Sequence, residues 1–149
     1  YKYIYNYPSR EAYGALAMGQ LYTEIYNNMR AVIRANQHQP FSFYSAHDTS
    51  VMPFLNAIGA WDGIWAPYAS LLQMELWVSP QNDEPLVRWI YNRQEIVLPG
   101  CDGYFCTFSQ FSSLVQPLLL KDPVTACKIP VGRPHASQQR LGVYTHSGW

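Results

Sequence analysis

Residues 41–59 read FSFYSAHDTSVMPFLNAIG, in which bulky side chains are followed by a His-Asp pair and a helix-like segment. Bulky side chains stand on both faces of residues 41–46, with Phe41 and Phe43 on one face and Tyr44 on the other. A strand that is buried on both faces is typical of a parallel sheet. We therefore predict a short buried strand over residues 41–46, with His47 and Asp48 at its carboxyl end.

A helix is predicted directly after this strand, running through Ile58. Thr49 or Ser50 can serve as its N-cap, because a hydroxyl side chain accepts hydrogen bonds from the first helical N–H groups. Pro53 is tolerated only in the first turn of a helix, and Gly59 stands where the helix would end. A strand followed closely by a helix is an α/β unit.

A long amphipathic helix is predicted on the N-terminal side, over residues 10–34. Its apolar positions recur three or four residues apart, which places them on one helix face. Ser9 can cap this helix, and the acidic Glu11 suits its first turn. The apolar face consists of Tyr13, Leu16, Ala17, Leu21, Ile25, Met29, Val32 and Ile33.

An antiparallel hairpin is predicted on the C-terminal side. Residues 71–78 alternate apolar and polar side chains, and residues 86–91 form a second strand after a turn over residues 79–85. Thr107 can cap a last short helix through about Gln116. Residues 130–149 have no periodicity and are expected to form an extended tail.

Composition and charge exclude several classes of protein. The chain has 149 residues, with 10 Lys and Arg against 10 Asp and Glu, so its formal charge is zero with histidines neutral. Without net positive charge or a basic stripe, no nucleic-acid partner is expected. Hydrophobic residues make up 48% of the chain and charged residues 13%, which is enough apolar surface for a core. No apolar stretch approaches the roughly 20 residues of a transmembrane helix, so no membrane-spanning segment is expected.

The start of the chain and its cysteines indicate that other parts of the protein are needed. Tyr1 replaces the usual Met and residues 1–7 lack a signal-peptide pattern, so we expect an upstream segment to have been removed or to lie elsewhere. Cys101 and Cys106 lie in a turn-rich loop that could close into a small disulfide ring, whereas Cys127 has no local partner. Three buried free thiols are the alternative. A structural zinc site is not expected, because the chain has neither Cys-x-x-Cys nor suitably spaced histidines.

His47 and Asp48 form the chemically suggestive position. Ligands of open α/β sheets bind outside the carboxyl ends of the strands, and a helix N-terminus there favours an anion. An imidazole and a carboxyl group at this edge could bind phosphate and deliver a proton. A plain turn, with Asp48 as an N-cap, is the alternative that position alone leaves open.

Several blocks of sequence, taken in order, resemble one known family. They are YSAHDT at residues 44–49, Leu55 with Ile58 and Gly59, PYAS at residues 67–70, Glu75 with Leu76, and LPGC at residues 98–101. Together they resemble the C-terminal part of a histidine acid phosphatase of the prostatic and lysosomal type, over roughly residues 19–127. The resemblance implies the C-terminal portion of a phosphoglycerate-mutase-like, three-layer α/β/α fold. Residues 1–129 would then form this part of the domain, without its N-terminal part.

The resemblance also implies roles for individual residues. Asp48 would be the general acid that protonates the leaving alcohol, and His47 would bind the phosphate beside it. A carboxyl group donates a proton only while protonated, which fits activity at low pH, and a placed proton donor typically contributes about 10²–10⁴ in rate. The family uses a nucleophilic histidine in an Arg-His-Gly motif and needs no cofactor or metal.

That nucleophile motif is absent from this chain. The nearest approach, Arg133-Pro134-His135-Ala136, lies in the predicted tail and lacks a strand before it. His38 and His146 are expected to be exposed rather than catalytic. Arg88 and Arg93 are expected on a solvated strand face. Nothing in these residues can act as the family's nucleophile.

The cysteines follow the same resemblance. It implies a short disulfide between Cys101 and Cys106, and a bridge from Cys127 to a cysteine outside this chain. Leu71 stands where related sequences often have a further cysteine, so one bridge is expected to be lost. An extracellular, lysosomal or other oxidising compartment is expected.

The sequence leaves three functions open for this chain. In the first, the chain is the C-terminal portion of an acid phosphatase that hydrolyses phosphate monoesters through a phosphohistidine, with the nucleophile on the missing N-terminal portion or a partner chain. In the second, it is a non-catalytic structural or interaction subunit of a larger, possibly oligomeric, assembly. In the third, it binds phosphate monoesters without turnover.

Overall fold

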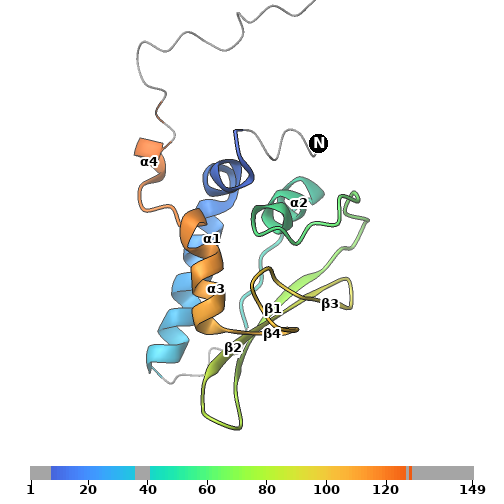
Figure 1. The fold of residues 1–149 in the computed structure, drawn as a ribbon. Coiled ribbons are helices and arrows are strands. Elements are labelled where there is room, and N and C mark those ends of the chain that lie inside the picture. Colours follow the sequence, from blue (N-terminus) through green and yellow to red (C-terminus); the bar gives the residue numbers. More distant parts are fainter. Residues whose placement is uncertain (1–7, 36–40, 127, 129–149) are drawn as a thin grey trace, which may run out of the picture.

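A computed structural model of the chain describes residues 8–35, 41–126 and 128 (Figure 1). Helices and strands are mixed along the chain. In order, they are α1 (Arg10–Ala35), α2 (Asp48–Ala57), β1 (Leu72–Val78), β2 (Pro85–Tyr91), β3 (Gln94–Ile96), β4 (Phe105–Thr107), α3 (Phe108–Val115), the 3₁₀ helix η2 (Gln116–Leu118) and α4 (Pro123–Ala126). Among these residues, no helix combines the length and the apolar character needed to cross a membrane.

The four strands form one antiparallel sheet around β2. The predicted hairpin is confirmed, with Leu72 opposite Tyr91 and Val78 opposite Pro85 in the β1 and β2 pair. On its other edge, β2 pairs with β3 over one half of its length and with β4 over the other half. The short strands β3 and β4 were not predicted from the sequence.

The helices lie over one face of this sheet. Val87 and Trp89 of β2 belong to a single core cluster to which α1, α2 and α3 contribute buried side chains. In Figure 1, α1, α2 and α3 lie on one side of the sheet. The alternation that predicted β1 places Leu72, Met74 and Leu76 against the same cluster. The sheet is therefore covered by helices on the face that carries Trp89.

A series of aromatic contacts joins these helices to the sheet. It passes from Tyr22 on α1 to Phe54 on α2, then to Trp89 on β2 and Phe111 on α3, with ring centroids 4.0, 5.7 and 6.2 Å apart in turn. Aromatic pairs at these separations contribute about 0.5–1.5 kcal/mol each beyond their buried area. The core thus fixes α2, which begins at Asp48, against both α1 and the sheet.

The predicted helix over residues 10–34 is confirmed as α1. Ser9 caps it as expected, since its Oγ accepts a hydrogen bond from the Ala12 N–H at 3.1 Å. Gly14 allows α1 to approach α2 closely: a Cβ at this position would lie 2.6 Å from the Cβ of Ala57. A larger side chain would separate the two helices.

The helix predicted after Asp48 is confirmed as α2, but its start differs from the prediction. His47 is the N-cap residue, in an extended conformation and without a side-chain capping hydrogen bond, so the predicted Thr49 or Ser50 cap is wrong. The helix begins earlier because the first helical hydrogen bonds run to the His47 carbonyl. Pro53 consequently lies beyond the first turn, contrary to the expectation that a proline would be confined to it.

The helix α2 ends just before Gly59, where the sequence predicts its end. Gly59 has a φ of +76°, a conformation that glycine adopts without steric cost. The N–H of Gly59 donates to the Asn56 carbonyl and that of Ala60 to the Leu55 carbonyl, both at 2.9 Å. This pattern is a Schellman motif, which satisfies carbonyls of the last helical turn.

The strand predicted over residues 41–46 is not formed. The segment has no regular secondary structure and pairs with no strand among the described residues, and Phe41 and Phe43 are 76% and 73% exposed. A buried parallel strand requires neighbouring strands and covered faces. The described part of the chain provides neither, because its sheet is antiparallel and formed by residues 72–107.

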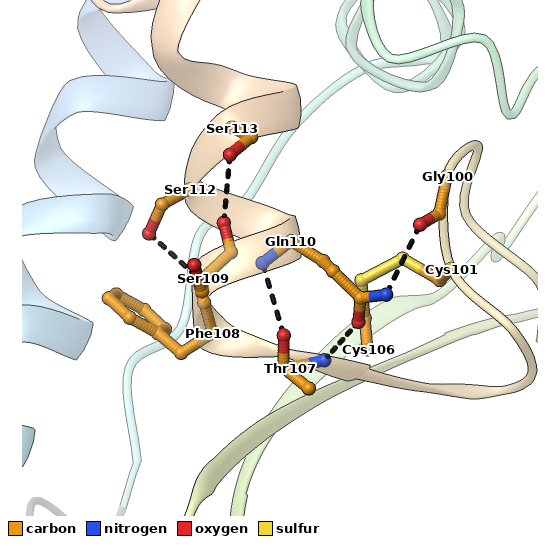
Figure 2. Close-up of a disulfide and its surroundings, with 9 residues drawn as sticks. All are labelled: Gly100, Cys101, Cys106, Thr107, Phe108, Ser109, Gln110, Ser112 and Ser113. Atoms are coloured by element: carbon orange, nitrogen blue, oxygen red, sulfur yellow. Dashed lines mark hydrogen bonds between the residues drawn. A yellow bond between two sulfur atoms is a disulfide. The ribbon is translucent and has the colours of Figure 1, made fainter.

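The loop before α3 is closed by a disulfide between Cys101 and Cys106 (Figure 2). The predicted N-cap Thr107 forms a capping box with Gln110, with both reciprocal hydrogen bonds present. The Gln110 side chain also donates to the Gly100 carbonyl at 3.4 Å, so the start of α3 is tied to the disulfide loop. Cys127 and the predicted tail over residues 130–149 lie outside the described residues.

Candidate active site

The two residues predicted to carry the chemistry lie together at the N-terminus of α2. The carbonyl of His47 accepts hydrogen bonds from the N–H groups of Ser50 and Val51, at 2.9 and 3.0 Å, and its side chain is exposed. Asp48 is the first residue of the helix and its side chain is half-buried. A carboxylate in the first turn interacts favourably with the helix dipole.

The segment that leads to His47 is anchored on α1. The Tyr44 hydroxyl donates to Oε1 of Glu24 at 3.0 Å and accepts from Nδ2 of Asn28 at 3.4 Å. Partial burial raises the pKa of the Tyr44 phenol, and the neighbouring Glu24 carboxylate raises it further. Tyr44 therefore stays a neutral hydrogen-bond donor, and it fixes the approach of the chain to the site.

The carboxyl group of Asp48 accepts two short hydrogen bonds. Its Oδ1 accepts from the Thr49 backbone N–H at 2.7 Å, and its Oδ2 accepts from the Trp65 indole Nε1–H at 2.7 Å. Trp65 was not predicted from the sequence, because it lies 17 residues away from Asp48 in the chain. The only local signal was that Trp65 belongs to a loop rich in tryptophan, glycine and proline.

This arrangement supports two chemical tasks. A carboxyl group held at a half-buried position can donate a proton to a group bound in front of it. An adjacent imidazole at a helix N-terminus can bind an anion, because the terminal N–H groups and the helix dipole favour negative charge. The two residue types therefore suit an anionic substrate that needs a proton at one atom.

The remaining polar residues singled out from the sequence lie elsewhere. Arg88 lies on the strand face away from the helices, as expected, and 23% of its side chain is exposed. Its partners were not predicted: the guanidinium bonds to Glu75 and Glu95 and lies over the rings of Trp77 and Phe105, at 5.3 and 5.2 Å from their centroids. The reason is that all four neighbours share the sheet face opposite the helices. Arg93 is exposed in the turn after β2, as predicted. His38, His135 and His146 lie outside the described residues.

Neither a metal-ligand cluster nor the open depression described below is part of the site at His47 and Asp48 in the described residues. Within the ranges that the structure describes, no group of three or more His, Cys, Asp and Glu side chains could hold a metal ion. A shallow open depression of about 380 Å³ lies beside the disulfide loop, lined by residues such as Gly100, Gln110 and Leu114. Neither His47 nor Asp48 lines this depression.

Fold and site together define a mixed α/β protein with a His-Asp pair at a helix N-terminus. A sequence profile of the histidine phosphatase superfamily (branch 2) matches residues 1–92. The chain therefore belongs to this superfamily, and the resemblance inferred from the sequence is confirmed. The helices and the four-stranded antiparallel sheet fit its α/β fold, as predicted.

Several curated proteins are similar to the chain. Counting factor 60 of Dictyostelium discoideum is 30% identical over 85% of this chain and 29% of its own length. Prostatic acid phosphatase of Bos taurus is 31% identical over 85% of this chain and 33% of its own length. Lysosomal acid phosphatase of Bos taurus is 26% identical over 89% of this chain and 32% of its own length. The chain thus spans about a third of the length of the curated relatives it matches.

Proposed function

We propose that this chain is the general-acid portion of an acid phosphatase that hydrolyses phosphate monoesters through a phosphohistidine. Asp48 donates the proton to the leaving oxygen, and His47 binds the phosphoryl group beside it. The observation that carries the proposal is the Asp48 carboxyl group, fixed through both of its oxygens at the N-terminus of α2. The names of the acid phosphatases among its relatives support the same activity.

The reaction proceeds in two steps. A histidine attacks the phosphorus atom, a P–N bond forms, and the ester P–O bond breaks. Asp48 protonates the departing oxygen, because an alkoxide is a poor leaving group. Water then hydrolyses the phosphohistidine, and the Asp48 carboxylate accepts the proton that this water loses.

The nucleophile of this reaction comes from outside the chain. The sequence has no Arg-His-Gly motif, and its length corresponds to about a third of the relatives. The missing N-terminal portion, or a partner chain, would supply the nucleophile together with arginines that stabilise the transferred phosphoryl group.

The exposed segment over residues 41–46 is the surface on which that missing portion would dock. Phe41 and Phe43 in this segment present large apolar side chains to solvent. No strand of the described part of the chain pairs with this segment, and an edge of this kind can accept another strand. Pairing there would bring the nucleophile of the missing portion close to His47 and Asp48.

The disulfide between Cys101 and Cys106 supports an oxidising compartment, either extracellular or lysosomal. We further propose that Cys127 is bridged to the missing portion. Peptide mass mapping of the native protein without reductant tests this bridge. A disulfide-linked pair of peptides that joins Cys127 to a cysteine outside these 149 residues supports it, and Cys127 found as a free thiol contradicts it.

Replacement of Asp48 tests the proposed function itself. In the native protein, Asp48→Ala is expected to lower kcat for an alkyl phosphate by about 10²–10⁴, the usual contribution of general acid catalysis. Turnover of p-nitrophenyl phosphate should fall far less, because its leaving group needs little protonation. Asp102→Ala, at an exposed aspartate of the disulfide loop, is the control and should leave both rates unchanged. Equal losses on the two substrates would contradict the general-acid role of Asp48.

A non-catalytic subunit is the second candidate. It is favoured by counting factor 60, a relative whose name does not denote an enzyme, and by the absence of an Arg-His-Gly motif in the chain. In that case His47 and Asp48 would be inherited without a catalytic use. Native protein without phosphatase activity on either substrate would favour this candidate.

A further inference from the structure

The loop that carries Trp65 is held in place on both sides of this residue. Just before it, the Trp61 indole donates to the Ile64 carbonyl and the Ile64 N–H donates to Asp62 Oδ1, both at 2.8 Å. Just after it, Ala66 is buried in a small cluster with Met52 of α2. The loop that carries Trp65 is therefore attached to the same helix that carries Asp48.

We propose that Trp65 is a positioning residue for the general acid. Its Nε1–H donates to Oδ2 of Asp48 at 2.7 Å and fixes the rotation of the carboxyl group, while the Thr49 N–H holds Oδ1. The inference rests on the proposed function, because it requires Asp48 to act as the acid. Trp65 is an addition to the candidate site, since it lies outside the sequence pattern around His47 and Asp48.

An indole suits this role better than most polar side chains. Its N–H can only donate a hydrogen bond, so it cannot accept the proton that Asp48 must deliver to the substrate. Each carboxyl oxygen retains a second lone pair, which can carry the proton toward the leaving oxygen. Trp65 thus orients the acid without competing for its proton.

The test uses Trp65→Phe in the native protein. Phenylalanine keeps an aromatic ring in the loop and removes the N–H donor. Because misorientation of a catalytic group costs rate without abolishing it, kcat for an alkyl phosphate is expected to fall about tenfold. The KM for the alkyl phosphate should stay within about twofold of that of the original protein. The kcat for p-nitrophenyl phosphate should also stay within about twofold, because the p-nitrophenolate leaving group depends little on the acid.

Trp77→Phe is the matched control. The Trp77 indole also donates to a carboxylate, Oε2 of Glu75 at 2.8 Å, and its exposed fraction of 47% is close to the 43% of Trp65. It lies on the sheet face opposite the helices. The control should leave both rates unchanged.

A double variant separates the possible failures. If Trp65 acts through Asp48, Trp65→Phe combined with Asp48→Ala should be no slower on the alkyl phosphate than Asp48→Ala alone. Additive losses in the double variant would overturn the inference. It would also be overturned if Trp65→Phe slowed both substrates equally, raised the KM or failed to fold. If Asp48→Ala itself shows no preference between substrates, or the native protein is inactive, the proposed function fails and the inference falls with it.

Discussion

Tyr22 of α1 stacks on Phe54 of α2, with ring centroids 4.0 Å apart and planes within 3° of parallel. The Tyr22 hydroxyl also donates to the Phe54 carbonyl at 2.6 Å, in the last turn of α2, where carbonyls lack helical partners. Burial raises the pKa of the Tyr22 phenol well above its ordinary value, so it remains a neutral donor. One side chain thereby supplies both a packing contact and a hydrogen bond to the helix that begins at Asp48.

Tyr22→Phe is expected to reduce the free energy of unfolding by about 1–3 kcal/mol, because it leaves a buried carbonyl without a donor. Urea denaturation of the native protein measures this loss. Tyr26→Phe is the control, since the Tyr26 hydroxyl makes a longer bond of 3.3 Å to Ser112 at a half-buried position. A loss at Tyr22 no larger than the loss at Tyr26 would contradict the importance of the hydrogen bond to Phe54.

Gly14→Ala is expected to force α1 and α2 apart, because the new Cβ would lie 2.6 Å from the Ala57 Cβ. Overpacking of this kind costs about 1–3 kcal/mol, which exceeds the gain of about 1 kcal/mol from replacing a helical glycine with alanine. Thermal denaturation should therefore show a lower Tm.

Ala57→Gly tests whether the contact between the two helices is the cause. Combined with Gly14→Ala, it removes the opposing Cβ, and the double variant should be more stable than the sum of the two single losses predicts. Simple additivity would show that the cost of Gly14→Ala arises elsewhere.

The ion pair between Arg88 and Glu75 predicts a pH-dependent contribution to stability. Partial burial acts to raise the pKa of Glu75, but hydrogen bonds from Trp77 and Arg88, with the Arg88 charge, outweigh it and lower the pKa below 4.5. A carboxyl group whose pKa is lower in the folded state stabilises the protein above the unfolded pKa, and this stabilisation disappears as pH falls through the folded pKa.

Glu75→Gln should therefore lower the free energy of unfolding by about 0.5–1 kcal/mol at neutral pH, the range for a partly exposed pair. The difference from the original protein should shrink at pH values below 4.5, the ordinary pKa of the group. Urea denaturation across this pH range, with Asp102→Asn as the exposed control, measures it. A difference that does not change with pH would mean that packing rather than charge is lost.

The disulfide between Cys101 and Cys106 predicts a sensitivity of α3 to reductant. A bridge that closes so short a loop contributes about 2 kcal/mol by restricting the unfolded chain. Reductant should lower the stability of the original protein by at least about this amount, and by more if other bridges are present. A variant with Cys101→Ser and Cys106→Ala should start at the lower stability, and any loss that reductant still causes in it reports other bridges. A variant as stable as the oxidised protein would rule out this contribution.

Local signals predicted much of the fold. The caps at Ser9 and Thr107, the apolar period of α1 and the alternation of β1 depend on neighbours within a few residues, and each corresponds to an observed element. The strands β3 and β4 are only three residues long, too short for a period to appear. Residues 41–46 were predicted as a strand because their side chains suit one, but strand formation depends on neighbours that the described residues lack.

The candidate site was predicted in part. His47 and Asp48 were identified by their position between a strand-like segment and a helix, and by the resemblance to a family. The contact between Trp65 and Asp48 depends on how a loop folds back onto α2, which no periodicity encodes. Likewise, Arg88 appeared to be an exposed charge, because the pairing of β2 with β1, β3 and β4 brings in Glu75, Glu95 and Phe105 only in three dimensions.

In the proposed phosphohistidine reaction, this chain supplies the acid but not the nucleophile. The most direct measurement is to quench the native protein during turnover of p-nitrophenyl phosphate and to locate the bound phosphoryl group by peptide mass mapping. We expect an acid-labile, alkali-stable phosphohistidine on a peptide outside the 149 residues. A phosphoryl group on a residue of this chain, or turnover without any phosphoenzyme, would contradict the claim.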